Sequence, residues 1–183
     1  MEVDFAVELG PVDETLEFPW AAGDRVRYYD LKRQPELLAL IEEARDLKPL
    51  SEFLAAVNAP GTSFETAKCD TWSTTEMNPE EEIFGAACKF GSYVDLLFSD
   101  DRRFSFPAHE KLVKRWTALL QRVPEIPAAA EFIVRRCYFQ GEVRDGFYIT
   151  LYSFGYGEDE AHARIQWAIG LKLVENAIRQ AEG

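Results

Sequence analysis

Apolar and polar residues alternate along residues 2–8, where three apolar side chains are separated by acidic or small ones. This period of two predicts a short strand with one face in solvent. Gly10-Pro11 ends the pattern, and no sustained period follows in the next segment. We therefore expect residues 1–34 to form an N-terminal strand and an irregular arm, and residues 35–183 to form a single α+β domain.

Apolar residues that recur three and four positions apart predict four helices. Pro35 and Pro49 suit the first turns of two of them. The last helix has the widest apolar face, which includes Trp167 and is typical of a helix buried against a sheet. Gly170 in this face indicates close approach to another backbone, because glycine is otherwise unfavourable in a helix. The expected helices cover 35–47, 49–58, 107–122 and a final segment from Glu158 past Arg179.

Segments rich in aromatic and β-branched residues predict strands in two hairpins. A tight first turn at Asn78-Pro79 would place Cys69 opposite Cys88, and a one-step change of register would separate them. Hairpin strands are antiparallel, so we expect an α+β fold: a mostly antiparallel sheet of about five to six strands, in the order β-α-ββ(β)-α-ββ-α, with helices packed on one face. The expected strands are 63–75, 82–90, 131–139 and 146–155, and the segment 93–98 is either a continuation of 82–90 or a third strand. The α-β-β units 35–99 and 107–155 are candidates for an internal repeat.

The composition is that of a folded chain with a strongly acidic surface. The 183 residues are 47% hydrophobic and include 20 Lys and Arg against 32 Asp and Glu, which gives a net charge of −12 and a pI near 4.7. This balance disfavours nucleic acid and anionic membranes as partners, because both repel an acidic surface. No apolar signal region follows the acidic N-terminus, and the three cysteines are an odd, widely spaced set. We therefore expect a soluble cytoplasmic protein.

Residues that carry chemistry are sparse. His109 and His162 lie in no metal-binding spacing, so both are expected at the surface. The cysteines are expected to be buried and inert, with a redox pair of Cys69 and Cys88 as an alternative. We expect no catalytic set, no metal and no cofactor, which favours a non-enzymatic protein. The segment Gly155-Tyr156-Gly157 predicts a strand-to-helix connection with one positive φ angle.

Acidic residues gather in two segments, and either could dock a basic protein by charge complementarity. A solvated face that only maintains solubility is the alternative for each. The leading hypothesis is a non-enzymatic binding protein that acts stoichiometrically on a basic partner, as inhibitors, immunity or antitoxin proteins and accessory subunits do; the oligomeric state stays open. The expected partner-binding residues are Glu80, Glu81 and Glu82 in the first hairpin and Asp13, Glu14 and Glu17 in the arm.

The aromatic residues support a second hypothesis. Strand 146–155 carries Tyr148, Tyr152 and Phe154 on one face and apolar residues on the other. Such a strand is either covered on both faces or presents an aromatic row to a ligand. The alternative function is therefore a small-molecule-binding protein or an enzyme with an aromatic-lined pocket between sheet and helices. The candidate pocket residues are Trp72, Cys69, Asp95, Arg135, Arg136 and Tyr148.

Overall fold

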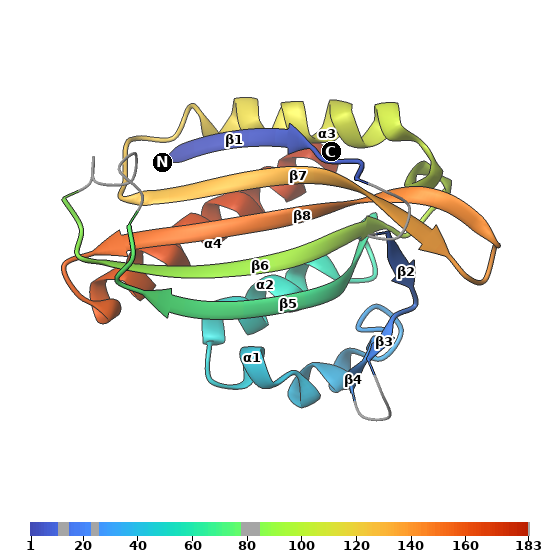
Figure 1. Cartoon of the computed structure of the whole chain (residues 1–183), viewed down its shortest axis with the longest axis horizontal. Coiled ribbons are helices and arrows are strands. Elements are labelled where there is room, and N and C mark those ends of the chain that lie inside the picture. The colour runs from blue at the N-terminus through green and yellow to red at the C-terminus, as the bar shows by residue number, and fades with distance from the viewer. Residues whose placement is uncertain (11–14, 23–25, 78–84, 183) are drawn as a thin grey trace.

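The computed structural model describes residues 1–10, 15–22, 26–77 and 85–182, which form a mixed sheet with helices on one side (Figure 1). The strand order is β1-β7-β8-β6-β5, and β2 also pairs with β7. β1 and β2 run parallel to β7, whereas the remaining pairings of this sheet are antiparallel. The predicted α+β class is confirmed. The strands are β1 (Glu2–Val7), β2 (Leu16–Phe18), β5 (Phe64–Thr74), β6 (Cys88–Phe98), β7 (Ala128–Phe139) and β8 (Arg144–Gly157), beside a separate two-stranded sheet of β3 (Ala21–Ala22) and β4 (Val26–Arg27).

Three helices pack on one face of the sheet, and Figure 1 looks onto the opposite face, with α2 and α4 behind the strands. The predicted placement of the helices on one face is therefore confirmed. The helices are α2 (Lys48–Val57), α3 (Phe106–Leu120) and α4 (Glu160–Glu182), with the short α1 (Glu42–Arg45) and the 3-10 helices Pro35–Leu40 and Asp101–Phe104.

Two tryptophans fill the space between the helices and the sheet. Trp116 of α3 packs against Phe64 and Phe132, with ring centroids 5.5 and 5.2 Å apart. Trp167 of α4 is 1% exposed, and its indole N–H donates to the Ser92 hydroxyl at 2.8 Å. The last helix is therefore buried against the sheet, as its wide apolar face predicts.

Two glycines expected to connect β8 to the last helix have a different role. Gly155 and Gly157 lie inside β8 and have no positive φ angle, so the predicted turn is wrong. A Cβ atom at Gly155 would overlap the backbone of Trp167, so the missing side chain allows α4 to approach the strand. Gly170 makes the matching approach from the helix, where a Cβ atom would lie 3.2 Å from that of Ala128.

The predicted helix 35–47 is broken. A 3-10 helix ends at Leu40, Ile41 is extended with φ −81° and ψ 110°, and α1 follows. No residue of the 3-10 helix is buried, and short helices depend on tertiary packing for their stability. The predicted segments 82–90 and 93–98 belong to one strand, β6, which runs without interruption from Cys88 to Phe98 and confirms that 93–98 continues the preceding strand. Residues 82–84 of the first prediction lie outside the described residues.

The structure defines the register of the first hairpin, which the sequence leaves open. Cys69 pairs with Val94, so Cys69 and Cys88 do not lie opposite one another. Val94 is fully buried on the helix-covered face, and burial of one strand face specifies the register more strongly than a turn motif does. The expected turn, Asn78-Pro79, lies outside the described residues.

His109 is buried, which corrects the expectation of a surface histidine. Its Nδ1 lies 2.9 Å from the carbonyl oxygen of Ser105, and its ring centroid lies 4.9 Å from that of Phe98. His109 stands four residues before Val113 and therefore shares the buried stripe of α3. His162 is exposed, as predicted.

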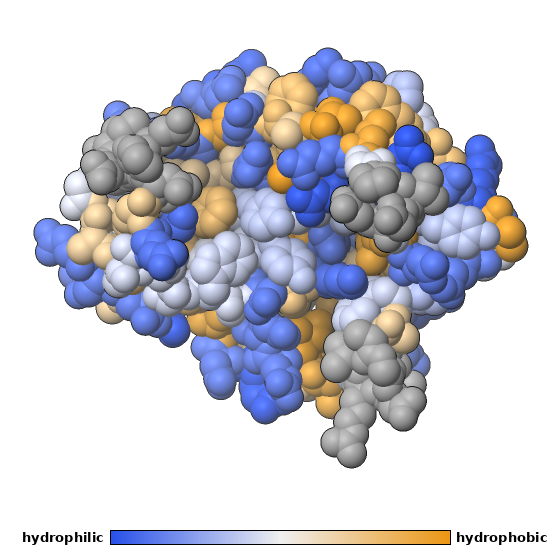
Figure 2. Space-filling model, viewed as in Figure 1, coloured by the Kyte–Doolittle hydropathy of each residue, from blue (hydrophilic) through white to orange (hydrophobic). Residues whose placement is uncertain are grey.

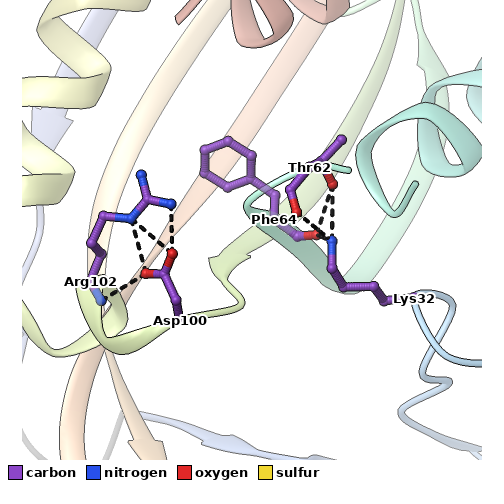
Figure 3. Close-up of polar contacts among 5 residues, drawn as sticks. All are labelled: Lys32, Thr62, Phe64, Asp100 and Arg102. Carbon is purple, nitrogen blue, oxygen red and sulfur yellow. Dashed lines mark hydrogen bonds and ion pairs between the residues drawn. The ribbon is translucent and has the colours of Figure 1, made fainter. Parts of the chain in front are cut away.

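Two polar contacts fix the ends of β5 and β6 (Figure 3). The ammonium of Lys32 donates to the carbonyl oxygens of Thr62 at 2.7 Å and Phe64 at 2.9 Å, which ties the arm to the start of β5. Asp100 follows β6, and its carboxylate accepts from the main-chain N–H and the guanidinium of Arg102. These bonds hold the pKa of Asp100 below its ordinary value.

Candidate functional site

One row of side chains crosses the open face of the sheet. Directly paired residues project to the same side of a sheet, so strand register identifies the row. Asp4 of β1 pairs with Glu131 of β7, Glu131 with Tyr152 of β8, Tyr152 with Tyr93 of β6, and Tyr93 with Asp70 of β5. The row therefore has two tyrosines at its centre and carboxylates at both ends.

The two tyrosines of this row and the neighbouring Trp72 and Phe154 form an aromatic platform of four half-buried rings: Trp72, Tyr93, Tyr152 and Phe154. The Trp72 centroid lies 6.4 Å from that of Tyr152 and 6.0 Å from that of Phe154, both edge-to-face. A Cβ atom at Gly91 would lie 2.8 Å from the Trp72 ring, so the missing side chain leaves room for the indole on the sheet. Helices α2, α3 and α4 pack on the opposite side of the sheet.

Figure 2 views the same face and shows pale side chains of intermediate hydropathy at its centre, where β8 and β6 cross Figure 1. Hydrophilic side chains surround them. Partial burial, followed by the nearby Glu8 and Asp4, raises the pKa of Glu131. This carboxylate therefore stands in an environment that favours its neutralisation.

A buried carboxyl group lies next to the platform. Asp95 of β6 is 5% exposed, and its Oδ1 accepts a hydrogen bond of 2.7 Å from the Thr150 hydroxyl. Arg135 donates to the same hydroxyl at 3.3 Å and to a carboxylate oxygen of Glu8 at 2.9 Å. Burial raises the pKa of Asp95 to about 6, although the Thr150 hydrogen bond, Lys68 and Arg135 all lower it.

The N-terminal arm covers one end of the open face. Leu16 and Phe18 of β2 pack against Leu97 and Tyr148 in a second apolar cluster, separate from the main core. The Phe18 centroid lies 5.7 Å from that of Phe139. Beside this cluster is a cleft of about 230 Å³, and its lining includes Glu8, Arg135, Arg136 and Tyr148.

The structure brings four of the six candidate pocket residues to one face. Trp72, Asp95, Arg135 and Tyr148 all belong to the open face, and the exposed Arg136 lines the cleft beside it. Cys69 lies elsewhere: it packs against the main core and lines a different cavity at the edge of β5.

The candidate partner-binding residues fall mostly outside the described residues. Asp13 and Glu14 of the arm and Glu80, Glu81 and Glu82 of the hairpin belong to this group. Glu17 of β2 is described and exposed, and it accepts a hydrogen bond of 2.9 Å from the side-chain amide of Gln140.

The thiols are poor nucleophiles. All three cysteines are free, with Cys88 and Cys137 buried and Cys69 half-buried. Burial raises the pKa of both Cys69 and Cys137 to about 12, which leaves almost no thiolate at neutral pH. Across the described ranges, no group of three or more His, Cys, Asp and Glu residues is placed to hold a metal ion.

Sequence reasoning missed the acidic ends of the row. Asp4, Asp70 and Glu131 are far apart in the chain, and only the pairing of five strands places them in line. The available signal was a carboxylate at an open-face position of β1, β5 and β7. That signal could not be used before the register was known.

Comparisons with protein-family models, with curated proteins and with solved structures found no match. In the described part of the chain, no helix is long and apolar enough to cross a membrane.

Proposed function

We propose that this chain is a non-enzymatic binding protein that holds a basic protein partner stoichiometrically against its open sheet face. The aromatic platform, with carboxylates at both ends of the adjoining row, is the observation that carries the proposal. An inhibitor, an immunity or antitoxin protein and an accessory subunit are the functional classes that act in this way.

The chemistry of the platform suits Lys and Arg side chains. A cation is attracted to the face of an aromatic ring, and Arg135 and Lys89 already lie 5.9 and 5.3 Å from the centroids of Tyr152 and Phe154. Half-buried aromatic side chains are also frequent anchors of protein interfaces. A basic segment could therefore place apolar area on the rings and its charges at the acidic ends.

The electrostatics of the row favour the same class of partner. Burial raises the pKa of Glu131 most, and repulsion from the nearby Glu8 and Asp4 raises it further. A partner cation would relieve this repulsion. The net charge of −12 would in addition speed the encounter with a basic protein by long-range attraction.

The side chains that most often perform catalysis are poorly placed for it in the described structure. Burial lowers the pKa of His109, which keeps its ring neutral inside the core. His162 is exposed and lies 3.0 Å from an oxygen of Asp159. Together with the raised thiol pKa values, these positions support binding rather than nucleophilic catalysis.

Affinity capture from the native host tests the proposal. The baits are the wild-type chain, Trp72→Ala/Phe154→Ala, and the matched control Ile165→Ala/Ile169→Ala, which removes exposed apolar area from α4. We expect a basic protein to bind the wild type and the control at one-to-one stoichiometry. The platform variant should bind at least about thirtyfold more weakly, because loss of an interface anchor costs at least about 2 kcal/mol of binding free energy. Circular dichroism checks that each bait is folded, and equal retention by all three baits would contradict the proposal.

A further inference from the structure

A second site lies at the edge of the sheet, away from the aromatic platform. A cavity of about 320 Å³ opens where the arm, the 3-10 helix Pro35–Leu40, α1 and α2 meet β5. This volume is within the range of small-molecule sites. Figure 2 shows an apolar strip below the lower edge of the sheet, next to the position of α1 in Figure 1. The apolar lining comes from the arm, the 3-10 helix and the residue after it, α2 and β5, and it includes Trp20, Leu31, Leu40, Ile41, Leu54 and Cys69.

The arm is held in place on this side by specific contacts. The indole N–H of Trp20 donates to the carbonyl oxygen of Ala67 in β5 at 2.8 Å. Lys32 follows the buried Leu31 and bonds to the carbonyl oxygens of Thr62 and Phe64. The walls that come from the arm are therefore fixed against β5 before any ligand arrives, which reduces the ordering that binding requires.

The charged groups of the cavity are arranged for a cation. Glu42 and Glu43 of α1 both line it, and Glu42 is exposed while Glu43 is half-buried. Lys68 is the basic residue of the lining, and its ammonium lies 4.8 Å from the centroid of the Trp20 ring. Besides burial, the negative charges of Glu43, Asp70 and Asp95 raise the pKa of the Cys69 thiol, in keeping with a negative potential inside the cavity.

We infer that this cavity binds a small organic cation: an ammonium group joined to one aryl or short alkyl body. The body packs among Leu31, Leu40 and Leu54, and the ammonium group points toward Glu42 and Glu43. An anion of the same size would be repelled by both carboxylates, and a neutral molecule would gain only the apolar contact. This site is separate from the open face, so a test of it does not depend on whether the proposed protein partner exists.

Titration with phenethylamine, followed in ¹H–¹⁵N NMR spectra, tests the inference. The probes 2-phenylethanol and 3-phenylpropanoate have a similar aryl body with neutral and negative polar ends. We expect phenethylamine to shift the indole N–H signal of Trp20 and the amide signals of Leu40 and Glu43 saturably. The neutral alcohol should bind at least about threefold more weakly, and the carboxylate more weakly still.

Charge-neutralising variants test the role of the two carboxylates. Glu42→Gln/Glu43→Gln should weaken phenethylamine binding about fivefold and leave 2-phenylethanol unchanged, because partly exposed ion pairs contribute modestly. The matched control Glu36→Gln/Glu52→Gln removes two nearby carboxylates that do not line the cavity and should bind like the wild type. Equal affinity for the three probes, no saturable shift at Trp20, or equal weakening by both double variants would overturn the inference.

Discussion

Replacing Asp95 with asparagine should stabilise the protein at neutral pH. Asp95 is 5% exposed, and burial raises its pKa from 3.8 to about 6. A carboxyl group whose pKa rises on folding binds its proton more tightly in the folded state. The folded protein is therefore favoured at low pH. Its free energy of unfolding falls as the pH rises from about 4 through about 6.

The size of this effect follows from the pKa shift. A shift of one pKa unit corresponds to about 1.4 kcal/mol, so a rise from 3.8 to about 6 corresponds to about 3 kcal/mol. Asparagine resembles the protonated acid in shape, and its side-chain oxygen can still accept from the Thr150 hydroxyl. We expect Asp95→Asn to match the wild type near pH 4 and to exceed its free energy of unfolding by up to about 3 kcal/mol at pH 8.

Urea denaturation from pH 4 to pH 8 measures the difference. Asp4→Asn is the matched control, because it removes an exposed carboxylate from the same sheet face and should change stability by no more than about 0.5 kcal/mol. If Asp95→Asn is no more stable than the wild type at pH 8, the carboxylate is stabilised by its surroundings and the reasoning fails. A buried acid retained at this expense would suit a surface selected for binding cations.

Three further predictions concern the core. Trp167→Ala should lower the free energy of unfolding by about 3–5 kcal/mol, because Trp167 is 1% exposed, and an unchanged melting temperature would place α4 outside the core. Gly155→Ala should cost about 1–3 kcal/mol by pushing α4 away from β8, whereas equal urea midpoints would show that the helix can move freely. Ellman's reagent should leave Cys88 and Cys137 unmodified in the native state, react slowly at Cys69 and label all three cysteines after denaturation; rapid native labelling of Cys69 would revive a reactive-thiol role.

Elements with a clear period could be predicted from the sequence. The helix predicted over 107–122 is α3 (Phe106–Leu120), and the strands predicted over 131–139 and 146–155 lie within β7 and β8. Each has a wide buried face that repeats with the period of its element. The periodic apolar residues were sufficient to predict these elements, because the same residues are buried by tertiary packing.

The number of residues between two side chains of a strand decides whether they lie on the same face of the sheet. Trp72 and Cys69 are three residues apart on one strand, and an odd spacing places side chains on opposite faces. Both are candidates for one pocket by residue type, whereas Trp72 belongs to the open face and Cys69 packs against the main core. Arg135 and Arg136 are adjacent and therefore project to opposite sides of β7, although both reach the cleft beside the arm.

Properties that depend on several segments could not be predicted. Strand β8 has apolar or aromatic residues on both faces, and only the packing of α4 decides which face stays open. The edge cavity needs the arm, α1, α2 and β5 together, and nothing in the local sequence brings Glu43 near Cys69. The acidic row likewise depends on the register of five strands.

The association rate of the captured basic partner, measured against salt concentration, tests the central claim most directly. Association should slow as the Debye length falls from about 10 Å at 0.1 M to about 3 Å at 1 M salt. Asp4→Lys/Asp70→Lys, which reverses one exposed carboxylate at each end of the row, should slow it at low salt, with little loss of fold stability because exposed charges contribute little to folding. Two triple variants serve as comparisons and show which acidic cluster contributes to association. In each, three carboxylates are changed to Lys: Glu80, Glu81 and Glu82 in the hairpin, or Asp13, Glu14 and Glu17 in the arm. Binding that does not depend on salt, with all three charge-reversed proteins matching the wild type, would mean that the acidic surface serves only solubility and would contradict the account.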